Sequence, residues 1–406
     1  MTGPLPLAGL RVVEFSHMVM GPTCGLVLAD LGADVVKVEP VRGDNTRNLP
    51  GSGAGFFVSL NRNKRSIALD IRTPRGVEIA KRLVARSDVV IENFKPGGME
   101  NLGLGYEALK FVNPRLIYCA LKGFLSGPYE HRAALDEVVQ MMGGLAYMTG
   151  PPGRPLRAGA PVNDMMGGMF AVIAILSALR ERERTGRGQY LKSSLFENVA
   201  FLVSSSMAQF AVTGQAAAPM PARISAWAVY DVFDTADGLQ IFIGVVTDTQ
   251  WRAFCEAFGL HDLGADAALS TNAQRVTARE RIIPMLRALF KGMTREEVAR
   301  RCEQTGLPFA PITRPDELFD DPQLGAPGGL IEVTIPNGGT TRIPALPIEF
   351  DGRRLGLRLD IPRAGEHTLA VAEEIGLDPG EIDTLRREGI LAAESDIAGG
   401  GTSKKR

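Results

Sequence analysis

The sequence predicts an α/β protein with a doubly wound parallel sheet and a second, smaller domain. In the first third of the chain, short apolar strands alternate with helical segments, a pattern that favours parallel strands covered by helices. Beyond Pro219-Met220-Pro221 the pattern changes to a hairpin followed by helices, which indicates a separate α+β unit. The chain has 406 residues, of which 45% are hydrophobic, so it can form more than one core.

The expected sheet has a functional edge. Its strands are expected at residues 10–15, 34–38, 66–71, 88–91 and 116–121. Ligands of such sheets bind beyond the carboxyl ends of the strands. The residues near these ends include His17, Glu39, Asn93 and Lys122. No Gly-x-Gly-x-x-Gly follows the first strand, so a dinucleotide site is not indicated.

Helices connect these strands and continue after them. Pro74 suits the first turn of a helix over 73–87, because its missing N–H is not needed there. A strongly apolar helix is expected over 165–180, with both faces covered, and a second buried helix over 193–212. The second unit begins with a hairpin in 227–245 that turns at residues 236–238. The remaining elements are a helix at 21–31, helices at 248–258, 277–291, 294–304, 368–375 and 380–388, and strands within 332–350.

Composition excludes several classes of protein. A net charge of −1 argues against nucleic-acid binding, and no apolar run reaches the length of about 18 residues that a membrane span needs. The N-terminal residues lack the pattern of a secretory signal. The four cysteines are scattered and the four histidines dispersed, so we expect no metal site and a reducing, cytoplasmic setting.

Asp164 is the most informative residue. It lies in AGAPVNDMMGGMFAVIAILSALRERERTGRGQ, where one carboxylate precedes Gly167, Gly168 and the long apolar helix. The helix dipole and free N–H groups favour its charged form. The glycines leave room beside the backbone, and nearby N–H groups could hold an oxyanion. A carboxylate in this setting suits covalent acyl transfer, whereas the alternative interpretation is a simple helix N-cap.

Six segments resemble the family III CoA-transferases, which include formyl-CoA transferase and carnitine CoA-transferase. They are LRVVEFSHMVMGP, LADLGADVVKVEP, NRNKRSIALDIRTPRG, VIENFKPGGMENLGLGYEAL, NPRLIYCALKGFLSGPY and the late GEHT. They occur in the family's order over nearly the whole chain. The resemblance implies an interlocked ring homodimer, in which a Rossmann-like large domain is built from both termini. The expected parts are 1–218 and the return segment 325–394 in the large domain, 219–324 in the small one, and a disordered tail at 395–406.

The resemblance also implies site residues. Asp164 matches the family's catalytic aspartate, and Asp136 matches an acidic position near the site that orients or tunes it. The family's CoA pocket falls on His17, Met18, Leu69, Arg72, Asn93 and Phe94. An exposed first-turn residue is the alternative for Arg72, a core residue for Phe94, and a surface helix cap for Asp136.

Two features depart from formyl-CoA transferase. An arginine that helps to hold CoA in that enzyme falls on Asn101 here, so Arg62, Lys64 and Arg65 become candidates for the phosphates. A solvated basic surface is the alternative for that run. The mobile glycine-rich loop of that enzyme has no counterpart between residues 218 and 244.

The resemblance implies transfer of CoA from an acyl-CoA to an acid through an aspartyl anhydride and an aspartyl-CoA thioester. The segment LKGFLSGPYEHRAALDEVVQMMGGLAYMTGPPGRPLRAG is similar to bacterial members that act on small dicarboxylic acyl-CoAs of the mesaconyl-CoA type. A second carboxylate could be held by Arg132, Arg157 or Arg223, or each could form a structural ion pair.

Two alternatives remain open. Alpha-methylacyl-CoA racemase shares the fold but needs a histidine base, and that position falls on Leu135 here. His131 would have to replace it from a different place. The other alternative is a CoA-binding protein without catalysis, which a retained Asp164 disfavours.

Overall fold

The structure is a computed structural model that describes residues 4–223, 225–336 and 338–399. It divides into two compact units, one formed by residues 1–221 together with 322–406, and the other by residues 222–321. The larger unit therefore takes its chain from both ends of the sequence.

A seven-stranded sheet forms the centre of the larger unit. Its order is β14-β3-β2-β1-β4-β5-β6, and all neighbours pair in parallel except β14 with β3. The strands are β1 (Arg11–Phe15), β2 (Asp34–Glu39), β3 (Lys64–Leu69), β4 (Val89–Glu92), β5 (Ile117–Lys122), β6 (Gln189–Ser194) and β14 (Leu391–Ala392). The predicted parallel sheet is confirmed.

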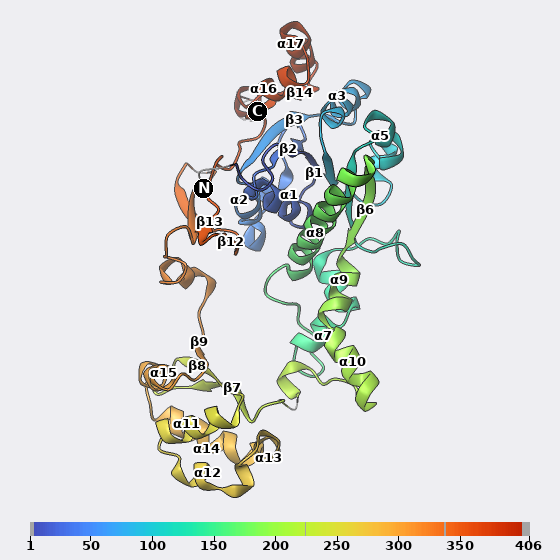
Figure 1. The fold of residues 1–406 in the computed structure, drawn as a ribbon. Helices are drawn as coiled ribbons and strands as arrows, with labels where there is room; N and C mark the ends of the chain where they lie inside the picture. Colours follow the sequence, from blue (N-terminus) through green and yellow to red (C-terminus); the bar gives the residue numbers. More distant parts are fainter. Residues whose placement is uncertain (1–3, 224, 337, 400–406) are drawn as a thin grey trace, which may run out of the picture. The chain divides into compact units, whose positions relative to one another are not determined.

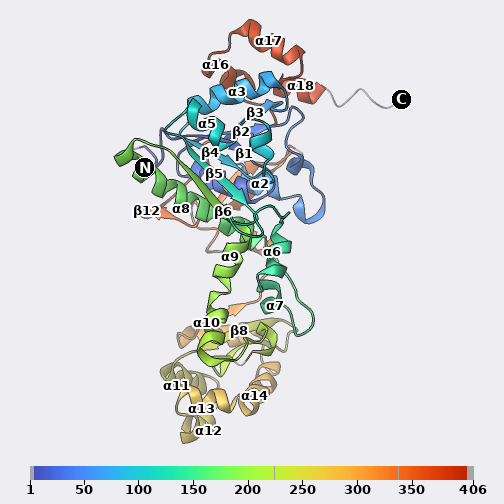
Figure 2. The same cartoon turned by 90° about the vertical axis from the view of Figure 1, so that its right-hand side faces the viewer.

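Helices cover both faces of this sheet (Figures 1 and 2). The helices on one face are α1 (Met20–Asp30), α6 (Asp136–Met142) and α8 (Val162–Thr185). Those on the other are α3 (Pro74–Ala85), α5 (Tyr106–Val112), α16 (Thr368–Glu374) and α17 (Pro379–Arg387). Short helices in connections are α2 (Phe56–Leu60), α4 (Gly98–Asn101) and α7 (Leu145–Thr149). Each face has its own apolar core, as expected for strands that are buried on both sides.

The C-terminal segment is fastened to β3 by the residues of the GEHT motif. The N–H of His367 donates to the Ser66 carbonyl at 2.9 Å. The Thr368 hydroxyl accepts from the Ala68 N–H at 3.0 Å and donates to the Ala392 carbonyl at 2.8 Å. These bonds explain how a chain end so distant in sequence completes the sheet.

The segment of the chain that follows the smaller unit and precedes α16 forms further strands of the larger unit. They are the hairpin of β10 (Leu330–Thr334) with β11 (Thr340–Pro344), and the short pair of β12 (Glu349–Phe350) with β13 (Arg353–Arg354).

In its described residues, the smaller unit has a three-stranded antiparallel sheet and five α-helices. The predicted hairpin is formed by β7 (Val229–Asp234) and β8 (Gln240–Val245), and β9 (Phe309–Pro311) adds a third strand. The helices are α11 (Asp248–Ala257), α12 (His261–Ala265), α13 (Asn272–Thr277), α14 (Arg279–Lys291) and α15 (Arg295–Gln304). Phe254 and Phe290 lie fully buried in their common core.

The segment predicted as one buried helix over 193–212 differs in the structure. It begins with the end of β6 and continues as α9 (Leu195–Leu202) and α10 (Ser204–Thr213), which meet at a bend of 50°. No residue of α10 is buried within the chain. The strand was missed because β6 is an edge strand whose outer positions are polar, so it lacks a continuous apolar run.

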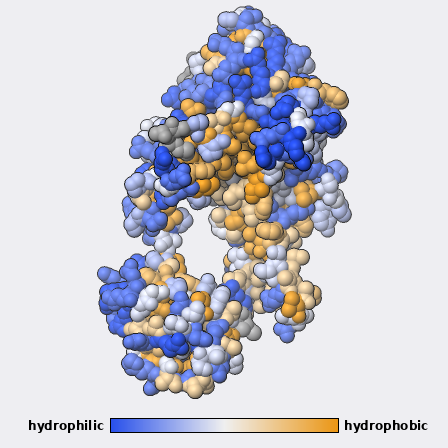
Figure 3. Space-filling view, viewed as in Figure 1, coloured by the Kyte–Doolittle hydropathy of each residue, from blue (hydrophilic) through white to orange (hydrophobic). Residues whose placement is uncertain are grey.

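Helix α8 is covered on one face only, although the sequence predicted cover on both. Ala171 and Ile175 are buried against α1 and the sheet, whereas Met169 and Ile173 are exposed. Figure 3 shows apolar surface over α8 to α10. Among the described residues, α8 is the one unbroken helix long and apolar enough to cross a membrane, but its buried face belongs to the core of this unit.

The expected disordered tail begins as a helix. Residues 394–399 form α18 (Glu394–Gly399), so the prediction of disorder is wrong for 395–399. The reason is an ion pair between Arg386 and Asp396 at 2.8 Å, and the same carboxylate accepts from the Ala393 N–H at 2.9 Å. Residues 400–406 lie outside the described part of the chain.

Candidate active site

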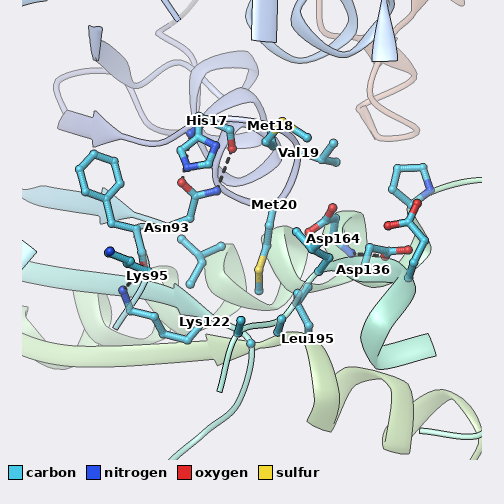
Figure 4. Close-up of a pocket in the computed structure, with 18 of the residues that line it drawn as sticks. His17, Met18, Val19, Met20, Asn93, Lys95, Lys122, Asp136, Asp164 and Leu195 are labelled. Atoms are coloured by element: carbon cyan, nitrogen blue, oxygen red, sulfur yellow. Dashed lines mark hydrogen bonds between the residues drawn. The ribbon is translucent and has the colours of Figure 1, made fainter. Parts of the chain in front are cut away.

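A pocket of about 940 Å³ opens at the carboxyl edge of the sheet. The loops after β1, β4 and β5 form its walls, together with the first turns of α6 and α8 (Figure 4). It brings together eight of the site residues selected from the sequence, namely His17, Met18, Asn93, Phe94, Arg132, Asp136, Arg157 and Asp164. The edge predicted for ligand binding therefore holds a cavity of the size that small-molecule sites have.

Asp164 lies in the wall of this pocket, in the first turn of α8. It does not cap the helix, because α8 begins at Val162 and Pro161 is the residue before it. Among the described residues, no hydrogen bond or ion pair reaches the Asp164 carboxylate. The N-cap interpretation of Asp164 is therefore wrong, and its carboxylate is available to a ligand.

Asp136 caps α8 instead, from the first turn of α6. Its Oδ1 accepts from the N–H of Asn163 at 2.9 Å and from the N–H of Asp164 at 3.1 Å. Its Oδ2 accepts from the Gln140 amide, and the Gln140 carbonyl oxygen accepts from the Ala158 N–H at 2.8 Å. Asp136 is only 5% exposed, so it is not the surface cap of its own helix.

The pKa of Asp164 is raised to about 7. Burial is the largest cause, and the charges of Asp136 and Glu137 add to it. This is the opposite of the expectation from the helix dipole. The N–H groups of Asn163 and Asp164 at the start of the helix donate to Asp136 and not to the Asp164 carboxylate.

The two glycines after Asp164 allow two helices to pack closely. A Cβ on Gly168 would lie 2.7 Å from the Met20 carbonyl oxygen and 2.7 Å from Thr23 Cβ, both in α1, and one on Gly167 would lie 2.4 Å from Met20 Cε. The expectation that they leave room for a ligand is therefore wrong, since α1 fills that space. Their N–H groups lie inside the helical ladder of α8, so they are not free to hold an oxyanion.

Asn93 ties the loop after β4 to the loop after β1. Its Oδ1 accepts from the His17 N–H at 3.0 Å, and its Nδ2 donates to the His17 carbonyl at 2.8 Å (Figure 4). The rings of His17 and Phe94 lie 6.2 Å apart and tilted. Burial lowers the pKa of His17, which favours a neutral imidazole on this wall.

Leu69 and Arg72 follow the same sheet edge but do not line the pocket. The Leu69 side chain is 1% exposed and belongs to the core beneath α16 and α17. Arg72 is 78% exposed and its guanidinium pairs with Asp70 at 2.8 Å. Their contact with a ligand stays a prediction.

The basic run of residues 62–65 is neither a phosphate site nor a solvated surface. Arg62 donates to Asp30 at 3.1 Å, and Lys64 pairs with Glu14 at 2.9 Å, both within the interior. Arg65 pairs with Asp34 at 2.6 Å. The sequence hypothesis is wrong here because this run enters β3, where carboxylates of neighbouring elements pair with each cation, buried ones with Arg62 and Lys64 and partly exposed ones with Arg65.

Sequence reasoning missed Lys95, which lines the pocket next to Phe94. Its side chain is exposed, and within the described ranges no carboxylate pairs with it. The signal was present in the segment ENFKPGG, where the lysine directly follows Asn93 and Phe94. Lys122 also lines the pocket, but it is paired with Glu92 at 2.6 Å.

The arginines proposed for a second carboxylate separate into two groups. Arg132 and Arg157 line the pocket. Arg132 lies over the Tyr129 ring at 4.9 Å, and Arg157 lies 3.5 Å from Glu137. Arg223 belongs to the smaller unit and is not among the residues that line this pocket.

The racemase alternative depends on the residue beside Asp136. Leu135 lines the pocket and is 63% exposed, so the residue that the resemblance places at the position of the racemase base has an apolar side chain. His131 is exposed and lies outside the lining of the pocket.

Comparison with known proteins agrees with this fold. Residues 7–368 match the family described as CoA-transferase family III. The chain is 35% identical to succinate–glutarate CoA-transferase of Agrobacterium fabrum, and the aligned region covers 91% of this chain and 96% of the relative. It is 33% identical to succinyl-CoA:mesaconate CoA-transferase of Haloarcula marismortui, over 92% of this chain and 97% of the relative. The solved structure of a CAIB/BAIF family protein from Brucella suis matches with a TM-score of 0.80 and 37% identity, over 92% of this chain and 100% of that one.

These matches, together with the parallel sheet, define the class of the protein as an α/β enzyme that acts on acyl-CoA. The chain belongs to CoA-transferase family III, and it is a CoA-transferase. Its substrates are CoA thioesters and carboxylic acids, as in the family.

Proposed function

We propose that this enzyme moves CoA between small dicarboxylic acids, with Asp164 as the nucleophile. The observation that carries the proposal is the Asp164 carboxylate, which faces the pocket without a partner among the described residues. The relatives named for succinate, glutarate and mesaconate support the class of acid.

The reaction proceeds by exchange of acyl bonds. A carboxylate oxygen of Asp164 attacks the thioester carbonyl of the donor and the C–S bond breaks. This step releases CoA thiolate and forms a mixed anhydride between Asp164 and the donor acid. The thiolate attacks the Asp164 carbonyl, the donor acid departs, and an aspartyl-CoA thioester remains. The acceptor carboxylate attacks that thioester, giving a second anhydride and CoA thiolate. The thiolate then attacks the acceptor carbonyl, which releases the new acyl-CoA and regenerates Asp164.

The surroundings of Asp164 suit this role. A carboxylate whose pKa is about 7 is more nucleophilic when ionised than an ordinary one, yet it still ionises near neutral pH. Asp136 fixes the backbone of Asp164 through its hydrogen bonds to the start of α8. We assign Asp136 the role of orienting the nucleophile and raising its pKa.

The pocket offers groups for the rest of each substrate. Lys95 supplies an exposed ammonium for a CoA phosphate, and Phe94 with His17 supplies a surface for the apolar and aromatic parts of CoA. Arg132 and Arg157 supply guanidinium groups for the carboxylate of the acid that does not react.

Exchange kinetics test the function. The wild type should transfer CoA from succinyl-CoA to free glutarate or mesaconate, and Asp164→Asn should lose at least roughly a thousandfold in rate while still binding CoA. Arg157→Ala and Arg132→Ala should weaken the binding of succinyl-CoA more than the binding of propionyl-CoA, which lacks the second carboxylate. Uptake of deuterium at the alpha carbon of a 2-methylacyl-CoA, without CoA transfer, would support the racemase alternative. Binding without either reaction would support the non-catalytic one.

We also propose that a second copy of the chain covers the apolar surface of α8 to α10, as the resemblance implies. Met169, Ile173, Phe201 and Phe210 are exposed there, and exposed apolar side chains gathered on one surface mark sites of protein–protein contact. Dilution followed by light scattering should give a dimer at every concentration at which the enzyme is active, and an active monomer would contradict this arrangement.

A further inference from the structure

Met18 holds a backbone conformation that a methionine rarely adopts. Its φ is +62°, at the turn from β1 into α1. A left-handed conformation costs a residue with a side chain about 1 kcal/mol or more, so surrounding contacts must hold it. The turn matters because the Met18 side chain lines the pocket, beside His17 in Figure 4.

The contact that holds Met18 comes from Thr46, in the loop after β2. The N–H of Met18 donates to the Thr46 hydroxyl oxygen at 3.0 Å. The same hydroxyl donates to Asp44 Oδ1 at 2.8 Å, and the Thr46 N–H donates to that oxygen at 2.9 Å. Thr46 is 2% exposed and does not line the pocket, so it acts on the site only through Met18.

A buried lysine fixes the other end of this arrangement. Lys37 Nζ lies 3.0 Å from Asp44 Oδ2 and donates to the Ser16 carbonyl at 2.6 Å. The turn is thus held at Ser16 by Lys37 and at Met18 by Thr46. Between them, His17 is held on both its backbone groups by Asn93.

We propose that Thr46 is a positioning residue for acyl-CoA, which holds the Met18 turn in its left-handed form so that the Met18 side chain meets the CoA moiety. This inference rests on the proposed function of the pocket. Both properties of the hydroxyl are used, since it accepts from Met18 and donates to Asp44. Serine can replace both bonds, whereas valine keeps the shape of threonine and can make neither.

Kinetics of three variants test the proposal. Thr46→Val should raise the KM for succinyl-CoA about tenfold, the size expected when a buried donor loses its partner, with kcat within about twofold. Thr46→Ser should restore the wild-type KM. Thr368→Val is the matched control, because it removes a buried hydroxyl whose two hydrogen bonds join β3 and β14 and do not involve the Met18 turn. It should lower the Tm and leave KM unchanged.

A double variant shows whether Thr46 acts through Met18. Met18→Gly adopts the left-handed turn without strain but lacks the side chain, so its KM should rise and adding Thr46→Val should raise it no further. Because glycine at position 18 removes the strain of the left-handed turn, the double variant should fold and its KM can be measured even if Thr46→Val alone does not fold. An additive effect in the double variant, an unchanged KM in Thr46→Val, or a failed rescue by serine would overturn the proposal.

Hydrogen exchange separates this inference from the proposed function. Residues 16–20 should exchange faster in Thr46→Val than in the wild type, whether or not the protein transfers CoA. Loss of the proposed function would appear as a wild type without CoA transfer. Unchanged exchange in Thr46→Val would instead overturn the role of Thr46, whatever the wild type does.

Discussion

Asp136 and Asp164 are joined by a hydrogen bond from the Asp164 N–H to the Asp136 carboxylate, at 3.1 Å. The same contact places a second negative charge beside the Asp164 carboxylate. Asp136 thus fixes the position of Asp164. Burial raises the pKa of Asp164 to about 7, and the charges of Asp136 and Glu137 add to this effect. Position and basicity are both properties that a nucleophilic carboxylate needs.

This relationship predicts the pH dependence of transfer. Because Asp164 must be ionised to attack, kcat/KM should rise with pH and level off above about 7, the pKa of Asp164. Glu137→Gln removes one of the charges that raise this pKa, so the rising limb should move to lower pH by a few tenths of a unit. A pH profile of kcat/KM for both proteins measures this. If the rising limb of the pH profile stays in place in Glu137→Gln, the assigned environment of Asp164 is contradicted. A rising limb near pH 4 in the wild type would contradict it as well.

The same raised pKa predicts a cost in stability at high pH. A carboxyl that is harder to ionise in the folded state than in the unfolded state stabilises the fold below the unfolded pKa, and this stabilisation is lost as pH rises through about 7. Asp164→Asn cannot ionise, so its advantage over the wild type should grow between pH 5 and pH 8. At pH 8 we expect its Tm to be higher by roughly 2 °C or more. Thermal melts of both proteins at pH 5 and pH 8 test this, and an equal difference in Tm at the two pH values would argue against it.

Close packing of α1 on α8 predicts unequal effects of alanine at the two glycines. In Gly168→Ala the new methyl meets the Met20 carbonyl, which belongs to the backbone and cannot turn aside. We expect a loss of roughly 1–3 kcal/mol in the free energy of unfolding. Gly167→Ala meets the flexible end of Met20 and the side chain of Asn198, so it should cost less. Urea unfolding compares the two, and equal losses would mean that the helices can separate freely.

Most of the sheet could be predicted from the sequence, because strands buried on both faces are continuous apolar runs. The edge strand β6 could not, since only its last two residues, Ser193 and Ser194, are buried. Asp164 stood out because it is the one carboxylate before a long apolar helix. The pattern could not show that Asp136 caps that helix, since the contact joins residues 28 positions apart.

The basic run of 62–65 shows a second limit. A cluster of cations in a sequence is the same whether it meets water, a phosphate or buried carboxylates. Here the partner of Lys64 is Glu14, on a strand 50 residues earlier in the chain. Lys95 could have been selected, since it follows two residues already assigned to the pocket.

The most direct test of the central claim is to capture the activated carboxyl itself. The enzyme is incubated with succinyl-CoA and hydroxylamine, digested, and analysed by tandem mass spectrometry, with Asp164→Asn as the control. An acyl-activated or CoA-activated carboxyl reacts with hydroxylamine, so the account predicts a hydroxamate on Asp164 that depends on the acyl-CoA and is absent from the control. A hydroxamate on a different carboxyl group, or continued CoA transfer by Asp164→Asn at the wild-type rate, would contradict it.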